Sequence, residues 1–241
     1  FVMGPIVTSL PLGDYFADAG TWKYLSLIVL APISNVLPGV FDANPLPYAV
    51  NGSLWTLRYE FLAYLLTPLL YAATKKLCGG RKLVFAVVLA VLVLVHFLSY
   101  SGLYPLPKVL DNLFRLFAYY MAGVAVLELG LDKYCDSQFA VVALLVIIVF
   151  RDQVGIFSSL IMFVCVCTFT LGFSLTSNPR FAPCFKKNDY SYGIYIYAFP
   201  IQQCVVWLGG ASLPCAYLSC SVISFGITLL FAIASWFLVE K

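Results

Sequence analysis

Residues 83–99 read LVFAVVLAVLVLVHFLS, an apolar run with one histidine and no charged side chain. A helix that crosses a bilayer needs roughly 20 mostly apolar residues, and soluble domains rarely carry such a run. The composition of the whole chain agrees, since 62% of its residues are hydrophobic and only 10% are charged. Soluble domains are about a quarter charged. The sequence therefore predicts an all-α, integral membrane protein.

Six further apolar runs lie on either side of this stretch, at 53–73, 111–130, 137–150, 154–174, 191–208 and 215–238. Turn-forming glycine, proline and asparagine residues separate most of them, as expected of short loops. Together the runs predict a polytopic transmembrane helical bundle with about seven full spans, of which 137–150 is the shortest. A further run at 22–34 contains Pro32 and is expected to lie at the membrane interface or to re-enter.

Lysine and arginine gather in alternate loops of this predicted bundle. Nine lie in loops 74–82, 131–136 and 175–190 and at the C-terminus, whereas the opposite loops between the seven runs hold only Lys108 and Arg151. Cytoplasmic loops carry such an excess. We therefore expect a multi-pass protein of the inner or plasma membrane, with its C-terminus cytoplasmic and residues 12–52 outside. The net charge of +3 is too small to indicate a nucleic-acid partner.

Metal binding is not expected, because the chain has one histidine, His96, and its eight cysteines are scattered. The position of His96 near the outer end of its run is more typical of a packing or interface residue than of a catalyst. Three cysteines, Cys204, Cys215 and Cys220, lie near the outer face, where one disulfide remains an open alternative.

Polar side chains inside the apolar runs are the candidates for chemistry. Run 53–73 carries Ser53, Thr56, Glu60, Tyr64 and Thr67 at three- and four-residue steps, which predicts one polar helix face. A charge at the centre of a membrane helix costs roughly 2.5–3.5 kcal/mol on insertion scales. We interpret Glu60 as a functional carboxylate facing a wet cavity, the alternative being a structural ion pair.

Two other runs contain polar groups of interest. Asp111 and Arg115 are one helical turn apart, so they form a local ion pair, or Arg115 is the partner of Glu60 or a contact for an anion. Pro200 is expected to kink run 191–208. Tyr195, Phe199 and Gln202 share a face of that run, and Gln202 and Gln203 are both expected to be buried and to need partners, either other helices or a substrate.

The stretch NGSLWTLRYE at 51–60 resembles the Gly-x-Leu-Trp-x-Leu-x-x-Glu signature of the membrane acyltransferase 3 family. Two further segments resemble members of that family, namely Gly4-Pro5 with the 38–41 loop, and the stretch from Ser191 to Pro200. The resemblance implies a catalytic role for Glu60. It implies substrate-binding roles for Trp55, Arg115, Tyr195 and Gln202.

The same resemblance implies an enzyme of about ten spans that transfers an acyl group, often acetyl, from a cytoplasmic donor such as acetyl-CoA. The implied acceptors are hydroxyl groups of extracytoplasmic polysaccharides or lipid-linked sugars. No tightly bound cofactor is implied, and the partners are acyl-CoA, a cell-surface glycan and the lipid bilayer.

Residues 1–241 resemble only part of the family's membrane domain, and three spans are expected upstream of them. The family's histidine and Arg-x-x-Arg motif have no counterpart here, and Ala198 stands where many members have a second histidine. We therefore expect this piece alone to be inactive. A transporter or flippase of a lipid-linked glycan or small solute is the alternative function, and a structural membrane subunit is another.

Overall fold

The computed structural model describes residues 2–29, 36–75, 80–150, 155–175 and 189–240. These residues form ten α-helices and, apart from two isolated β-bridges, no β-structure. The predicted all-α class is confirmed for them. The chain divides into two compact units, one made of Phe1–Arg58 with Cys184–Lys241 and the other of Tyr59–Pro183. We describe each unit by itself.

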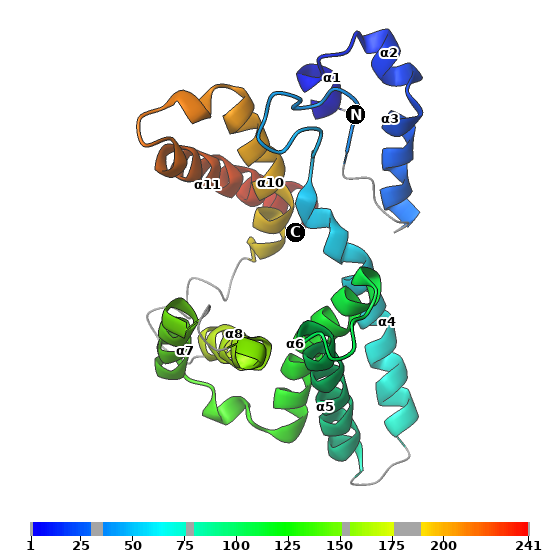
Figure 1. Ribbon diagram of the computed structural model, residues 1–241, viewed down its shortest axis with the longest axis vertical. Helices are drawn as coiled ribbons and strands as arrows, with labels where there is room; N and C mark the ends of the chain where they lie inside the picture. Colours follow the sequence, from blue (N-terminus) through cyan, green and yellow to red (C-terminus); the bar gives the residue numbers. More distant parts are fainter. Residues whose placement is uncertain (1, 30–35, 76–79, 151–154, 176–188, 241) are drawn as a thin grey trace. The chain divides into compact units, whose positions relative to one another are not determined.

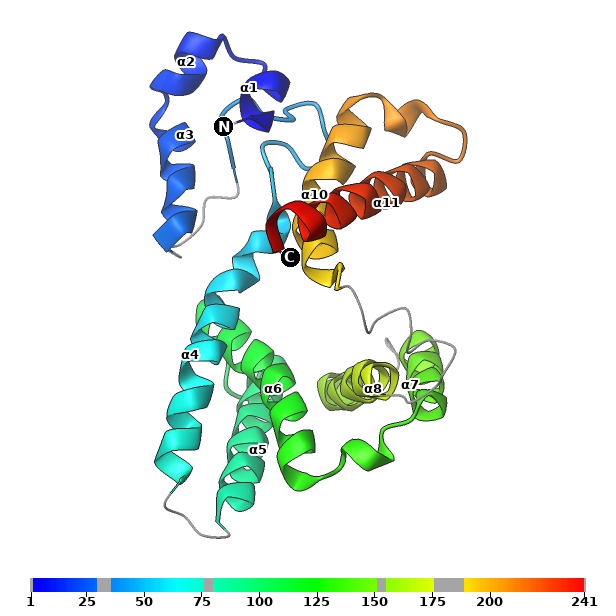
Figure 2. The same cartoon turned by 180° about the vertical axis from the view of Figure 1, so that it is seen from behind.

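The unit of residues 59–183 contains most of α4 (Leu57–Thr74), with α5 (Arg81–Tyr100), α6 (Lys108–Leu129), α7 (Ser137–Phe150) and α8 (Ser158–Ser174). Helices α5 and α6 form an antiparallel pair, and α7 pairs with α8 (Figures 1 and 2). The fully buried ring of Phe85 is at the centre of a core that α6 and α8 complete. The other buried members of this core are Leu92, Ala118, Met121, Ala122 and Phe163.

A hydrogen-bonded ion pair joins three helices at the end of this unit near loop 75–80. The Glu128 carboxylate of α6 accepts from Arg81 Nε at 3.0 Å and from the Tyr71 hydroxyl of α4 at 2.7 Å. The Arg81 guanidinium also lies 5.6 Å from the centre of the Tyr71 ring. Both oxygens of the carboxylate are therefore used, and the pairing ties α4, α5 and α6 together.

The other unit begins with three short helices, α1 (Met3–Val7), α2 (Leu12–Ala17) and α3 (Ala19–Lys23), followed by a 3-10 turn at Tyr24–Val29. Single bridges join Thr8 to Val40 and Val36 to Ala49. Side chains of these helices and of the loop at 36–50 bury one another in a small apolar core. Its buried members are Val7, Tyr15, Leu37, Val40, Phe41 and Val50.

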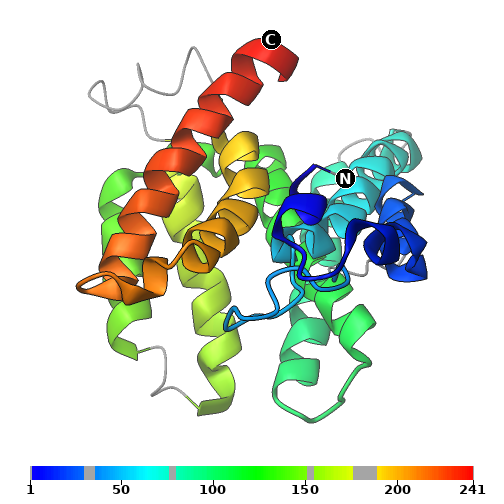
Figure 3. The same ribbon diagram turned by 90° about the horizontal axis from the view of Figure 1, so that it is seen from above.

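Helices α10 (Ser191–Trp207) and α11 (Ala216–Ser235) complete this unit, and a π-helical turn at Trp236–Glu240 continues α11. The two helices lie side by side (Figures 1 and 3). Helix α10 starts at an Asx turn, in which Asp189 Oδ1 accepts from the backbone N–H of Ser191 at 2.9 Å and from its hydroxyl at 2.6 Å. These hydrogen bonds to the ionised form lower the pKa of Asp189.

Each of the seven predicted runs holds a helix. Three of them, at Arg81–Tyr100, Lys108–Leu129 and Ala216–Val239, are long and apolar enough to cross a membrane, and α7 and α8 are shorter apolar helices. Large apolar side chains such as Leu94, Tyr217, Leu230 and Leu238 are exposed on these candidate spans. A protein in water rarely exposes so many, whereas a bilayer accepts them.

Two boundaries differ from expectation. The predicted helix at 53–73 is α-helical only from Leu57, because Gly52–Thr56 form a 3-10 turn that Asn51 caps by accepting from Ser53 N–H at 3.1 Å. The run at 22–34 is described only to Val29, and its placement at an interface stays a prediction. Lys76, Arg151, Arg180, Lys186, Lys187 and Lys241, on which much of the charge argument rests, lie outside the described residues.

Candidate functional site

A hydrogen bond to a backbone carbonyl of α10 joins residues 51–56 to that helix. Pro200 has no N–H, so the carbonyl of Ile196, four residues earlier, lacks its helical donor. The side chain of Asn51 supplies the missing donor, because its Nδ2 donates to the Ile196 oxygen at 2.9 Å. Asn51 is buried, with 5% of its surface exposed. One asparagine therefore caps the 3-10 turn through Oδ1 and completes the hydrogen bonding of α10 through Nδ2.

Tyr195 and Phe199 extend the contact between this segment and α10. The Tyr195 hydroxyl donates to the Ser53 carbonyl and shares a second, short hydrogen bond with the Thr56 hydroxyl. Gly52 lies against the Phe199 ring so closely that a Cβ on it would be 2.8 Å from Phe199 Cε2. The stretch NGSLWT is thus held to one face of α10.

Gln203 fixes the loop that precedes this segment. Its Nε2 donates to the carbonyls of Leu46 and Ala49, both at 2.8 Å. Asn44 Nδ2 in turn donates to the backbone oxygen of Gln203 at 2.9 Å and to its Oε1 at 3.1 Å. The sequence indicated that Gln203 needs hydrogen-bond partners, but it did not indicate that Gln203 belongs to the candidate site. Its partners come from a loop far away in the chain, and no local sequence pattern reveals such a contact.

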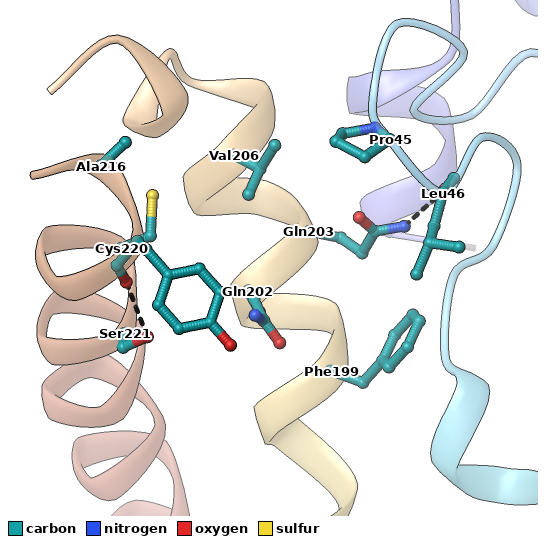
Figure 4. A pocket seen from close by; sticks show the side chains of 10 residues that line it. Pro45, Leu46, Phe199, Gln202, Gln203, Val206, Ala216, Cys220 and Ser221 are labelled. Carbon is teal, nitrogen blue, oxygen red and sulfur yellow. Dashed lines mark hydrogen bonds between the residues drawn. The ribbon is translucent and has the colours of Figure 1, made fainter.

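A cavity of about 350 Å³ lies beside this loop, between α10 and α11. Gln203 points from α10 toward Leu46, while Gln202 and Phe199 lie on the cavity wall (Figure 4). The prediction that both glutamines are buried is wrong, since Gln202 is exposed in the cavity. Helical geometry explains the difference, because neighbours along α10 point about 100° apart. The other lining residues are Pro45, Leu46, Val206, Ala216, Tyr217, Cys220 and Ser221.

The cysteines near this cavity are not paired. The structure gives Cys204, Cys215 and Cys220 as free thiols, so the open alternative of a disulfide is not realised here. Among the residues that the structure describes, no group of three or more histidine, cysteine or acidic side chains comes together that could hold a metal ion.

Glu60 lies in the first turn of α4 and is half-buried. The predicted polar stripe around it is divided, because Ser53 and Thr56 belong to the 3-10 turn and contact Tyr195. Thr67, further along α4, donates to the Ala63 carbonyl at 2.8 Å and to the Tyr120 hydroxyl at 3.3 Å. The catalytic role of Glu60 stays a prediction.

Trp55, in the adjoining 3-10 turn, is also half-buried, and its substrate-binding role likewise stays a prediction.

Arg115 and Asp111 have other partners than predicted. Arg115 donates to Asn112 Oδ1 at 2.9 Å, while Asp111 Oδ1 lies 3.8 Å from His96 Nδ1 of α5. The local Asp111–Arg115 ion pair is therefore replaced by a contact across the α5–α6 pair. The substrate role of Arg115 stays a prediction.

Comparison with curated proteins gives a relative in Shigella phage Sf6, named O-acetyl transferase. The two sequences are 29% identical over 247 residues, which covers all of this chain and 69% of the relative. The chain is a distant homologue of an O-acetyl transferase. No protein-family profile matches it, and no solved structure is similar to it. The homology includes residues 51–60 and α10, the two segments whose contacts define the candidate site.

Proposed function

We propose that this chain is part of an integral-membrane O-acyltransferase that moves an acyl group, most often acetyl, from acyl-CoA to a sugar hydroxyl. The acceptor is an extracytoplasmic polysaccharide or glycolipid. Homology to an O-acetyl transferase along the whole chain carries this proposal. The membrane acyltransferase 3 signature at 51–60, which the structure attaches to α10 through Asn51 and Tyr195, supports it.

The cavity beside α10 has features that suit a sugar. Its volume of about 350 Å³ is within the range of small-molecule sites. Aromatic rings from Phe199 and Tyr217 offer faces against which a pyranose can stack, and the amide of Gln202 offers a donor and an acceptor for hydroxyl groups. We assign the acceptor sugar to this cavity.

The proposed topology has seven spans, with α5, α6 and α11 crossing fully and α4, α7, α8 and α10 completing the bundle. In that topology the cavity and the first turn of α4 are at the outer ends of their helices. The acceptor then enters from outside, and the acyl donor reaches the site from the cytoplasmic side.

Transfer is tested with the full-length protein in membranes supplied with acetyl-CoA that is radiolabelled in the acetyl group. Alkali-labile label in the purified glycan fraction is the expected result. Gln202→Ala should raise the KM for acceptor with little change in the KM for acetyl-CoA. A full-length protein that labels no glycan, yet moves a lipid-linked glycan across vesicle membranes, would instead identify a flippase.

A further inference from the structure

A second cavity, in the unit of residues 59–183, is not used by the proposed reaction. It has a volume of about 380 Å³ and lies between α4 and the α5–α6 pair, which are neighbours in Figures 1 and 2. Leu66 and Leu69 on its α4 side are exposed, so it is a groove that opens at the surface of this unit. We call it the α4 groove. Its wall includes Leu70 and Ala73 of α4, Val88 and Leu92 of α5, and Phe117 and Met121 of α6.

The wall of the α4 groove offers almost no hydrogen-bonding group. Among the described residues that line it, only Thr67 has a polar side chain. The Thr67 hydroxyl already donates to the Ala63 carbonyl at 2.8 Å and to the Tyr120 hydroxyl at 3.3 Å. The hydroxyl groups of a sugar, or the amides of a pantetheine arm, would therefore be left unpaired there, which is unfavourable. The groove suits a hydrocarbon chain instead.

Basic side chains lie beyond one end of the groove. Arg81 is seven residues before Val88, which is two helical turns, so the two side chains are on the same face of α5. Arg81 Nε donates to Glu128, and the Arg81 side chain is 49% exposed. Lys75, which follows α4, and Lys82 are exposed and pair with no acidic side chain in the described part of the chain. Three cations against one carboxylate leave an excess of positive charge at this end.

The length of the groove agrees with the thickness of one lipid leaflet. Helices α5 and α6 are long and apolar enough to cross a membrane. Arg81 and Leu92 are 11 positions apart along α5, which is about 16 Å at the helical rise. Half of a bilayer hydrocarbon core of about 30 Å is about 15 Å. A phospholipid with its phosphate near Arg81 therefore places its acyl chain along Val88 and Leu92.

We infer that the α4 groove binds an acyl chain of an anionic phospholipid, whose phosphate is held by Lys75, Arg81 and Lys82. Basic pockets between membrane helices on the cytoplasmic side bind anionic headgroups, and the predicted topology puts these residues on that side. The lipid fills the space between α4 and its neighbours and so stabilises the folded unit by mass action.

The headgroup is tested by native mass spectrometry of the full-length protein in detergent. Phosphatidylglycerol and phosphatidylcholine with identical chains are titrated separately, and phosphatidylglycerol should bind more tightly. The double substitution Lys75→Ser with Lys82→Ser should weaken phosphatidylglycerol binding by roughly tenfold, because each lysine near an anionic lipid contributes severalfold. Binding of phosphatidylcholine should change little. Lys108→Ser removes an exposed lysine at the opposite end of α6 and should leave both affinities near wild type.

The acyl chain is tested by filling the groove. Ala73→Phe puts a ring into the space that the chain occupies and should weaken binding of phosphatidylglycerol and phosphatidylcholine alike. Ala90→Phe is the matched control, because Ala90 is also exposed but lies about 160° around α5 from Leu92. Equal lipid binding by these two variants would overturn the inference.

Measurements on the unmutated protein cover the case in which a variant fails to fold. Phosphatidylglycerol should raise the melting temperature in detergent more than phosphatidylcholine does, and equal shifts would contradict a site for an anionic lipid. Millimolar glycerol phosphate and coenzyme A should not displace bound phosphatidylglycerol, because neither carries an acyl chain. Displacement by either would assign the basic end to a free phosphate or to the acyl donor and would overturn the inference. These readouts are independent of acyl transfer, so failure of the proposed function would leave them unchanged.

Discussion

Gly193 of α10 packs directly against Ala232 of α11, so that a Cβ on the glycine would lie 2.8 Å from the Ala232 Cα. Both residues are buried. Membrane helices approach this closely where small residues meet, because apolar burial does not drive helices together in lipid. Backbone atoms on the Ala232 side cannot move aside as a flexible side chain can, so α10 and α11 would have to separate to accept a larger residue.

Gly193→Ala should therefore destabilise the protein in spite of the better helix propensity of alanine. Overpacking costs roughly 1–3 kcal/mol, which should appear as a lower melting temperature in detergent. Gly226→Ala on α11 is the matched control, since a Cβ there would meet nothing within 4 Å. That control should be neutral or stabilising by roughly 0.5–1 kcal/mol. Equal melting temperatures for the two variants would contradict the close packing.

Gln203→Leu should release the loop at 44–49. The substitution leaves the carbonyls of Leu46 and Ala49 without their donor and Asn44 without its side-chain acceptor. A fully buried group left unpaired costs roughly 1–3 kcal/mol, and these half-buried carbonyls cost less than that. We expect a lower melting temperature and faster proteolysis at 44–49. Gln202→Leu changes the neighbouring residue, which makes none of these contacts, and should leave both measurements near wild type.

Tyr71→Phe should weaken the junction of α4, α5 and α6 by removing the hydroxyl that donates to Glu128. The loss is about 1 kcal/mol for one hydrogen bond, somewhat more because its acceptor is charged. Thermal unfolding in detergent would measure it. Tyr64→Phe on the same helix is the control, because that ring is largely exposed. A melting temperature lowered equally by both substitutions would speak against a specific contact.

The predicted topology places loop 100–110 outside and loop 74–82 in the cytoplasm. To test this, single cysteines are introduced at Ser101 and at Lys75 in a background without native cysteines. Intact cells are then treated with a membrane-impermeant maleimide. Ser101→Cys should be labelled, and Lys75→Cys should be protected until the cells are permeabilised. The reverse pattern would invert the orientation of α4, α5 and α6.

Glu60→Gln keeps the shape of the side chain and removes its charge. If Glu60 is a functional carboxylate, the full-length variant should reach the membrane at normal levels and lose most of its acetyl transfer. The measurements are membrane abundance and label in the glycan fraction. Full activity would return Glu60 to a structural role, in which case Glu60→Ala should lower stability without changing the KM for either substrate.

The apolar runs predicted the positions of seven helices, because an apolar run in a membrane has few alternatives to a helix. Three of these helices are long and apolar enough to cross a membrane, and the full seven-span count stays a prediction. The start of α4 was misplaced because Gly52–Thr56 form a 3-10 turn, which is capped by Asn51, a residue outside the apolar run. The partners of Gln203 lie far away in the chain, and such a long-range contact produces no periodic pattern in the sequence around Gln203. The His96–Asp111 contact had a signal, since the two residues are nearly equidistant from the short loop that joins α5 to α6.

The unit that contains the cavity is assembled from segments that are synthesised at very different times. Hydrogen bonds from Asn51 to Ile196 and from Asn44 to Gln203 join residues 145 and 159 positions apart. While the ribosome produces residues 59–183, the buried amides of these asparagines have no protein partner, and the signature at 51–60 has no helix to dock on. A nascent chain therefore completes this unit only after α10 has entered the membrane. If the insertion of α10 is delayed, the unit stays incompletely folded, and chaperones and membrane proteases can act on it.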